Sequence, residues 1–358
     1  MHRLLARSSG FSVKIDRVSI ISLLLCIGVI VASGWLTWLV RKGALARGML
    51  DLPNWRSSHT VPTPRGGGVA IVVAASGSIG ITAMVMGLDV PLAMALLGGG
   101  LPVALVGYLD DRRSLSVRVR MGVHLLAASW AVYNLGGLAP LQIGACKLDL
   151  GFFGDVVAVL SVVWALNLFN FMDGIDGLAG SEAVFVSAAG AGLVVFSGLP
   201  QDTAVAGFLI AAASAGFLLW NWPPARIFMG DSGSCYLGYS LAVLALSVGR
   251  ANPGIFFAWV ILGGVFFVDS TVTLVRRIAS GERLYEAHRS HAYQRLARRW
   301  GSHRRVTLAV LAINLFWLYP MALLAMRLPN WASVVSGIAF VPLIILAWAI
   351  GSGRKEVD

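Results

Sequence analysis

Long apolar stretches, separated by short polar segments, run through nearly the whole chain. A helix that crosses a membrane needs about 20 mostly apolar residues. About eleven stretches reach that length, and they cover residues 18–40, 66–87, 90–109, 120–138, 154–172, 178–198, 203–222, 232–249, 254–275, 306–326 and 331–350. The longest segment between them, residues 276–305, is too short for a soluble domain. The pattern predicts an all-α polytopic membrane protein with 10–11 transmembrane helices, in one domain over residues 1–358.

One segment between two apolar stretches breaks the helical pattern. Residues 141–150 alternate in part between apolar and polar side chains, and Gly144 lies near their centre. Such alternation around a glycine is typical of two short strands joined by a turn. We expect a small β-hairpin here, on the periplasmic face.

The composition narrows the class of protein. Apolar residues make up 57% of the chain and charged residues 13%, and the mean hydropathy is +0.78. A soluble domain has about 25% charged residues, so these values exclude a disordered chain and an ordinary cytosolic enzyme. Three cysteines are too few for a disulfide scaffold.

The net charge of +11 arises from 28 basic residues that are unevenly distributed. Most lie in segments that share one side when successive stretches cross in alternation, chiefly 41–65, 110–120 and 276–305. Because Lys and Arg favour the cytoplasmic side, we expect these segments in the cytoplasm. The basic N-terminal tail then lies outside, against that rule. An excess of positive charge on a membrane protein also suits anionic phosphate substrates, and a nucleic-acid partner is not expected.

Polar residues gather at the cytoplasmic ends of the stretches. The segments concerned are about 41–65, 110–120, 167–177, 223–234 and 276–305. In the first of them, prolines and glycines surround Arg65, and His59 precedes it. This composition is typical of a rigid turn whose backbone approaches a ligand closely, although a plain loop entering a helix has it too.

Two adjacent carboxylates, Asp110 and Asp111, end the third stretch, and Arg120 follows them. Carboxylates at a membrane edge are costly unless they are paired or bind a metal ion. One of the two can act on a substrate while the other caps a helix or pairs with arginine. An ion pair without a catalytic role is the alternative.

Oxygen-bearing side chains recur in the next two segments. Asn167, Asn170 and Asp173 are three residues apart and so share one helix face, after which two glycines let Asp176 turn back. Asp231 opens the eighth stretch among small residues, as a helix cap or as a ligand of a metal–phosphate group. Oxygen ligands suit Mg²⁺, whereas a polar seam between helices is the alternative.

The late basic segment contains His288, Arg289, His291 and Arg295. In a helix His288, His291 and Arg295 would share a face, and arginine binds phosphate through two donors. A basic amphipathic helix lying on lipid is the alternative. Asp269, inside the ninth stretch, is either a functional carboxylate or a partner of Arg276.

Taken in order, these segments resemble the bacterial polyprenyl-phosphate N-acetylhexosamine-1-phosphate transferases, the WecA, WbpL and MraY superfamily of glycosyltransferase family 4. The resemblance extends from about Asp51 to Arg305 and is most specific at three places: the Asp110-Asp111 pair, the Asn170 to Gly177 stretch and Gly230-Asp231-Ser232-Gly233-Ser234. The turn at Arg65 and the late basic segment resemble the branch that starts O-antigen or related surface polysaccharides, rather than peptidoglycan-precursor enzymes.

The resemblance implies a reaction in the bacterial inner membrane, with the active site facing the cytoplasm. A UDP-N-acetylhexosamine and undecaprenyl phosphate would give undecaprenyl-diphospho-sugar and UMP, with Mg²⁺ as cofactor and Mn²⁺ as a substitute. Membrane lipids and a second copy of the chain are further partners to expect. The sugar is left open.

Roles follow for individual residues. We expect Asp110 or Asp111 as the catalytic base, since both lie where the lipid phosphate reaches the membrane edge. Asn170 and Asp231 are the expected metal ligands, with Asp173 and Asp176 in reserve. The expected substrate-binding residues are His59, Arg65, Arg120, Asn167, His288, Arg289, His291 and Arg295.

Two other functions share some of these features. A transporter of an anionic lipid or a nucleotide sugar also has many helices and intramembrane charges, but it predicts an internal repeat and polar residues at mid-membrane. A CDP-alcohol phosphotransferase also carries aspartates on one face. Its signature needs four carboxylates within two helical turns, which the asparagine-rich segment here does not match.

Overall fold

The fold is a bundle of long helices in a computed structural model, which describes residues 17–52, 61–144, 146–282 and 288–354. The first helices are α1 (Arg17–Ala46), α2 (Gly68–Met86), α3 (Val90–Arg113), α4 (Val117–Asn134), α5 (Gly151–Met172), α6 (Leu178–Phe196), α7 (Asp202–Asn221) and α8 (Asp231–Gly249). The later ones are α9 (Pro253–Leu262), α10 (Gly264–Ala279), α11 (Ala292–Trp300), α12 (His303–Ile313), η1 (Asn314–Leu318), α13 (Tyr319–Arg327), η2 (Pro329–Trp331) and α14 (Ala332–Ile350). The strands are β1 (Leu50–Asp51), β2 (Thr63–Pro64), β3 (Leu141–Ile143) and β4 (Cys146–Leu148).

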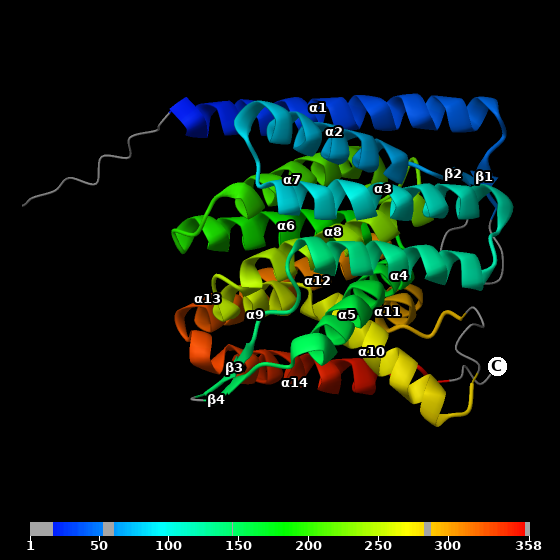
Figure 1. The fold of residues 1–358 in the computed structure, drawn as a ribbon. Helices are drawn as coiled ribbons and strands as arrows, with labels where there is room; N and C mark the ends of the chain where they lie inside the picture. The colour runs from blue at the N-terminus through cyan, green and yellow to red at the C-terminus, as the bar shows by residue number, and fades with distance from the viewer. Residues whose placement is uncertain (1–16, 53–60, 145, 283–287, 355–358) are drawn as a thin grey trace, which may run out of the picture.

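Every predicted apolar stretch is helical, which confirms the all-α membrane class. Within the described ranges, nine helices are long and apolar enough to cross a membrane, and the bent pair α9–α10 makes a tenth. The fourth stretch, residues 120–138, needs a correction, and it lowers the predicted number of spanning helices from 10–11 to 9–10 in the described part of the chain. Helix α4 carries Arg118, Arg120 and His124, which leave it too polar to count by length and composition. It nevertheless lies alongside α3 in the bundle (Figure 1).

The ninth stretch is not one straight helix, as the sequence had suggested. It breaks at Gly263, and α9 and α10 meet at an angle of 69°. Phe340 packs closely against the helix next to this break: a side chain at Gly264 would lie 3.0 Å from the Phe340 ring. The late basic segment also differs from a loop, since α10 extends to Ala279 and α11 forms a helix within it.

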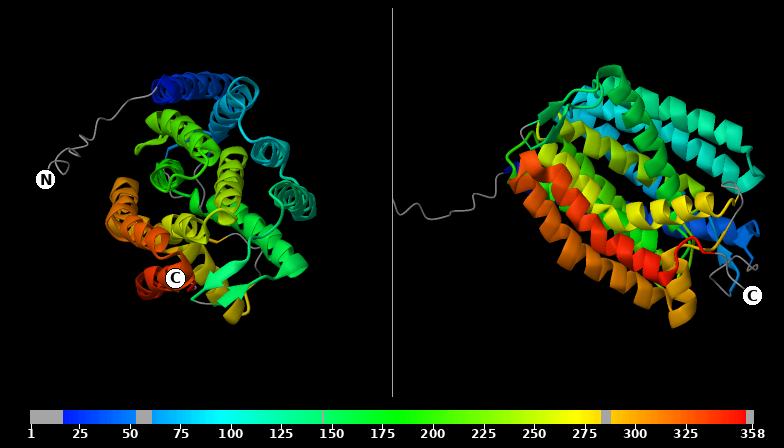
Figure 2. Two further views of the ribbon diagram at one scale, coloured as in Figure 1. Left: turned by 60° about the vertical axis from the view of Figure 1, so that its left-hand side comes forward. Right: turned by 90° about the horizontal axis from the view of Figure 1, so that it is seen from below.

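The two ends of the bundle carry different structures (Figures 1 and 2). The predicted hairpin is confirmed: β3 and β4 are antiparallel, with Leu141 opposite Leu148. It lies at one end, whereas strands β1 and β2, helix α11 and the segment after α14 lie at the other. The clusters of polar residues found in the sequence occupy that second end.

Glycines allow α3 and α2 to approach the start of α8 closely. A side chain at Gly107 of α3 would lie 2.6 Å from the backbone oxygen of Asp231, and one at Gly68 of α2 would lie 2.4 Å from the Cα of Gly233. Small residues at helix contacts are common in membranes, where close packing stabilises the bundle. These two contacts place the first turn of α8 against its neighbours.

The contact at Gly107 yields a test of this packing. Gly107→Ala would drive α3 and the first turn of α8 apart and cost about 1–3 kcal/mol of stability, as overpacking does. Gly77→Ala is the matched control, because a side chain at this exposed position of α2 meets nothing within 4 Å. Thermal unfolding in detergent should show a lower midpoint for Gly107→Ala alone, and equal midpoints would refute the tight contact.

Candidate active site

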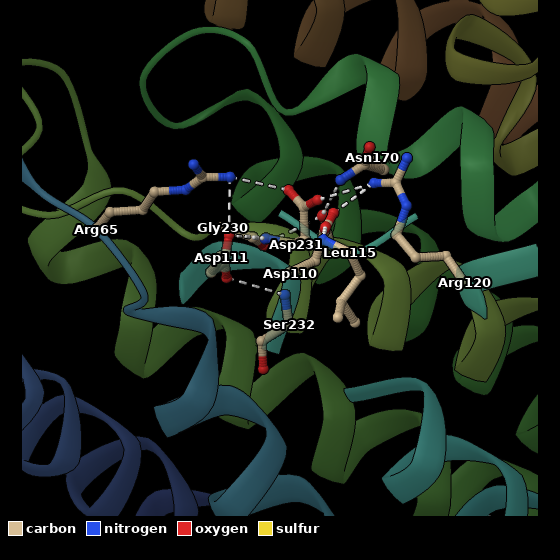
Figure 3. Close-up of polar contacts among 10 residues, drawn as sticks. Arg65, Asp110, Asp111, Leu115, Arg120, Asn170, Gly230, Asp231 and Ser232 are labelled. Carbon is tan, nitrogen blue, oxygen red and sulfur yellow. Dashed lines mark hydrogen bonds and ion pairs between the residues drawn. The ribbon is translucent and has the colours of Figure 1, made fainter. Parts of the chain in front are cut away.

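The ends of four helices and the segment before α2 bring polar and charged side chains together (Figure 3). Asp110 and Asp111 come from the last turn of α3, Asn170 from the last turn of α5, and Asp231 from the first residue of α8. Arg65 lies between β2 and α2, and Arg120 lies in the first turn of α4. We call this group the aspartate cluster: Arg65, Asp110, Asp111, Arg120, Asn170 and Asp231.

Asp111 caps the start of α8 from a neighbouring helix. Its Oδ1 accepts the backbone N–H of Asp231 at 3.1 Å, and its Oδ2 accepts that of Ser232 at 3.4 Å. Gly230, the residue before α8, provides no side-chain cap of its own, and a side chain there would lie 2.6 Å from Asp111. The Asp111 carboxylate therefore satisfies helix amides that would otherwise lack partners.

Two arginines hold the three carboxylates together. Arg65 Nη2 lies 2.8 Å from Asp111 Oδ1 and 3.1 Å from Asp231 Oδ1. Arg120 Nη1 pairs with Asp110 Oδ2 and lies 3.6 Å from Asp231 Oδ2. Three carboxyl groups and two guanidinium groups thus lie at the N-terminus of α8, where the helix dipole favours negative charge.

Asp110 and Asp231 differ from Asp111 in what they face. Asp110 accepts the backbone N–H of Leu115 through Oδ1, which ties down the turn between α3 and α4, and its Oδ2 faces Arg120. The Asp231 side chain is 19% exposed, against 10% for Asp110 and 6% for Asp111. Asp231 is thus the carboxylate of the cluster most open to a ligand.

Helix α5 contributes Asn170 to the cluster and places Asp173 beside it. Asn170 Nδ2 donates to Ser234 Oγ at 3.0 Å, and Asn170 also lies within hydrogen-bonding reach of Asp231. Asp173, which caps the end of α5, faces the backbone amide of Gly230. Burial and the nearby carboxylate of Asp231 raise the pKa of Asp173 well above its ordinary value.

Two expected ligands make other contacts. Asn167 donates to the backbone oxygen of Val163 one turn earlier in its own helix, at 2.7 Å. Asp176 accepts the N–H of Ala225 at 2.9 Å and lies 3.2 Å from His303 Nδ1, so it joins the segment before α8 to the start of α12. These contacts give Asp176 a structural role. His59 lies outside the described residues.

The start of α11 reaches the same end of α5. Tyr293 Oη donates to the backbone oxygen of Phe171 at 2.8 Å, and the ring of His291 lies 6.2 Å from that of Phe171. The rings of His288 and His291 are 5.0 Å apart. Burial and the neighbouring His291 and Arg277 lower the pKa of His288 to about 3, so this side chain is neutral at physiological pH.

The helical face expected for residues 288–295 is wrong, because α11 begins only at Ala292. His291 is its N-cap, and the guanidinium of Arg295 donates to the backbone oxygen of Arg354. The backbone oxygen of Arg289 accepts from Arg298 at 3.0 Å. The structure therefore brings the rings of His288 and His291 together, and it engages the Arg295 guanidinium with the segment after α14, whose Gly353 N–H donates to the backbone oxygen of Ser290 at 2.8 Å.

Asp269 has a role that the sequence left open. It accepts the N–H groups of Ala292 and Tyr293, at 2.9 and 3.2 Å, and so caps α11. It also accepts the hydroxyls of Thr273 and Ser352, at 3.2 and 3.1 Å. One buried carboxylate thus joins α10, α11 and the segment after α14. The position of Asp269 inside an apolar stretch indicated a special role for it, whereas no sequence pattern indicated a role for Ser352.

The cluster offers oxygen ligands rather than nitrogen or sulfur. In the described part of the chain, no group of three or more His, Cys, Asp or Glu residues is arranged to hold a metal ion. Asparagine can also bind a metal ion through its amide oxygen, and Asn170 lies beside Asp231. Carboxylate and amide oxygens are the ligands that a hard cation such as Mg²⁺ prefers, so the chemistry of the donor set fits this ion.

Comparison with known proteins places the chain in a family. Residues 93–249 match the model of glycosyl transferase family 4. A probable undecaprenyl-phosphate N-acetylglucosaminyl 1-phosphate transferase of Bacillus subtilis is 30% identical over 293 residues, which are 78% of each chain. The chain belongs to glycosyl transferase family 4.

Two further relatives extend the match beyond that region. A decaprenyl-phosphate N-acetylglucosaminephosphotransferase of Mycolicibacterium smegmatis is 29% identical and covers 94% of this chain and 89% of its own. An undecaprenyl-phosphate alpha-N-acetylglucosaminyl 1-phosphate transferase of Escherichia coli is 27% identical over 82% of each chain. The predicted family is confirmed, and its match covers α3, α5 and α8 with their aspartates.

The contacts of Asp269 predict a local effect of substitution. Asp269→Asn leaves one acceptor oxygen for several donors, and an unsatisfied buried donor costs about 1–3 kcal/mol. The amides of Ala292 and Tyr293 should then exchange hydrogen faster than in the wild type. Asp155→Asn is the control, because Asp155 accepts the N–H of Leu138 at the hairpin end. Unchanged exchange at α11 would mean that Asp269 does not hold this helix.

Proposed function

We propose that this family 4 chain transfers N-acetylhexosamine 1-phosphate from a UDP-sugar to undecaprenyl phosphate and releases UMP. The aspartate cluster is the observation that carries the proposal, because it joins three carboxylates and two arginines at one end of a membrane bundle. The named activities of the relatives support the same chemistry. We place the cluster on the cytoplasmic side of a bacterial inner membrane, at the start of O-antigen or related polysaccharide synthesis.

The reaction exchanges one phosphoanhydride bond for another. An oxygen of the lipid phosphate attacks the phosphorus that bears the sugar, the bond from that phosphorus to the UMP oxygen breaks, and UMP leaves with the electron pair. The main barrier is the approach of two anionic phosphates. Arg65 and Arg120 have the charge and the planar donors to neutralise them.

Asp231 and Asn170 are the proposed ligands of Mg²⁺, with Asp173 next to them and Mn²⁺ as a substitute. When bound, the ion would offset phosphate charge during the transfer. The greater exposure of Asp231 and its place at the helix start support this assignment. Asp176 is no longer a candidate, because its carboxylate joins two other segments.

Asp110 is the better candidate for the base that takes the last proton from the lipid phosphate. Both oxygens of Asp111 accept helix amides, and Arg65 pairs with one of them. Asp110 has one oxygen on a backbone amide and the other on the partly exposed Arg120, a contact that a phosphate can replace. Asp111 then serves to position Asp231.

His288, Arg289 and His291 are the proposed contacts of the UDP-sugar, since the start of α11 packs on the end of α5 that carries Asn170. His288 would act as a neutral hydrogen-bonding group. Arg295 leaves this set, because its guanidinium lies against the segment after α14.

The transfer itself is tested with purified protein, Mg²⁺, undecaprenyl phosphate and a panel of UDP-N-acetylhexosamines. We expect UMP and a lipid-linked diphospho-sugar in equal amounts, and loss of both with EDTA. Asp231→Asn should lower the rate by about a hundredfold or more, as the loss of one electrostatic group can. Asp149→Asn, at the hairpin end, should keep the wild-type rate. Movement of an intact UDP-sugar or lipid across vesicles without UMP would favour the transporter instead.

Kinetics separate substrate binding by the late segment from lipid anchoring. His288→Ala, Arg289→Ala and His291→Ala should each lower kcat/KM for the UDP-sugar about tenfold to a hundredfold, because a charge-assisted or buried hydrogen bond is worth about 1.5–3 kcal/mol. The KM for undecaprenyl phosphate should stay unchanged. An effect confined to the lipid substrate would reject the proposed contacts.

A further inference from the structure

A basic pocket lies between α11 and the end of α14, apart from the aspartate cluster. It has a volume of about 140 Å³ and is lined by Arg295, Leu296, Arg298, Arg299 and Ile350. Among the described residues, three of the five that line it are arginines, and none of these five is acidic. A pocket with this lining attracts an anion, and the planar donors of arginine suit a phosphate group.

Backbone contacts set the position of two of these arginines. The Arg295 guanidinium donates to the backbone oxygen of Arg354, and Arg298 donates to that of Arg289 at 3.0 Å. The charges of Arg295 and Arg354 also act on Arg276 at the end of α10. Arginines of α10, α11 and the segment after α14 thus lie near one another at this end of the bundle.

An apolar row on α14 leads to the same pocket. Pro342, Leu346 and Ile350 are four residues apart and therefore line up along one side of this helix. Pro342 and Leu346 are exposed, Leu346 by 44%, and Ile350 forms the wall of the pocket. Because α14 is among the helices apolar enough to cross the membrane, its exposed row faces hydrocarbon.

We propose that this pocket binds an anionic phospholipid of the surrounding membrane. The phosphate would lie among Arg295, Arg298 and Arg299, and an acyl chain would follow the row from Ile350 towards Pro342. The apolar row favours a lipid over a free phosphate, because only a lipid has an acyl chain that can pack against these apolar side chains. The bound lipid would stabilise α11, the helix whose first turn packs on the end of α5.

Lipid binding to the full chain can be measured by native mass spectrometry in detergent, with phosphatidylglycerol and phosphatidylcholine of the same acyl chains. The wild type should retain phosphatidylglycerol preferentially. Arg298→Gln/Arg299→Gln should weaken this binding about tenfold or more and leave phosphatidylcholine unchanged, since each basic residue near a membrane surface is a substantial electrostatic contact. Both side chains are exposed, so the fold should tolerate the change.

Arg113→Gln/Arg118→Gln is the matched control, with the same loss of charge on exposed residues at the end of α3 and the start of α4. It should bind phosphatidylglycerol as the wild type does. Equal loss in both double variants, or loss in neither, would overturn the proposal. Displacement of the lipid by millimolar inorganic phosphate would show a free-anion site, and displacement by equimolar undecaprenyl phosphate would show a substrate site; either result contradicts it. No UDP-sugar is present, so the result does not depend on the proposed transfer.

Discussion

Three carboxylates within one small volume at a membrane edge repel one another, and the rest of the site depends on how that repulsion is offset. Asp111 offsets part of this repulsion, because its two oxygens accept the backbone N–H groups of Asp231 and Ser232 at the start of α8. Arg65 and Arg120 bridge the remaining oxygens. The first turn of α8 can approach α3 closely only because Gly107 has no side chain. Packing and electrostatics therefore select the same arrangement.

A second carboxylate, Asp269, organises the late segment in the same physical way. Its oxygens accept backbone amides of α11 and hydroxyls from α10 and from the segment after α14. Both Asp111 and Asp269 thus cap a helix from another part of the chain, in a low-dielectric setting where an unpaired charge is costly. Each cap also places a neighbouring side chain: Asp231 in one case and His291 in the other.

The two carboxylates act at connected places. Tyr293, whose amide Asp269 holds, donates to the backbone of Phe171, one residue after Asn170. Residues near the end of α14 are therefore linked, through α10 and α11, to the helix that carries the proposed metal ligand. Through these contacts, a lipid bound in the proposed pocket beside α14 would affect the position of α11 against the end of α5.

The sequence alone determined the membrane class and the hairpin, and it named all six residues of the aspartate cluster as candidates, because apolar length, strand alternation and intramembrane charge are local signals. It could not decide which of Asp110 and Asp111 caps a helix, since adjacent residues carry the same local pattern. Nor could it reveal the break at Gly263, which lies beside Phe340 of α14, or the contact of Arg295 with the segment after α14. Asp176 looked like a ligand until the tertiary structure placed it against His303 and Ala225. Spacing along a chain limits which side chains share a helix face, but only packing decides what that face meets.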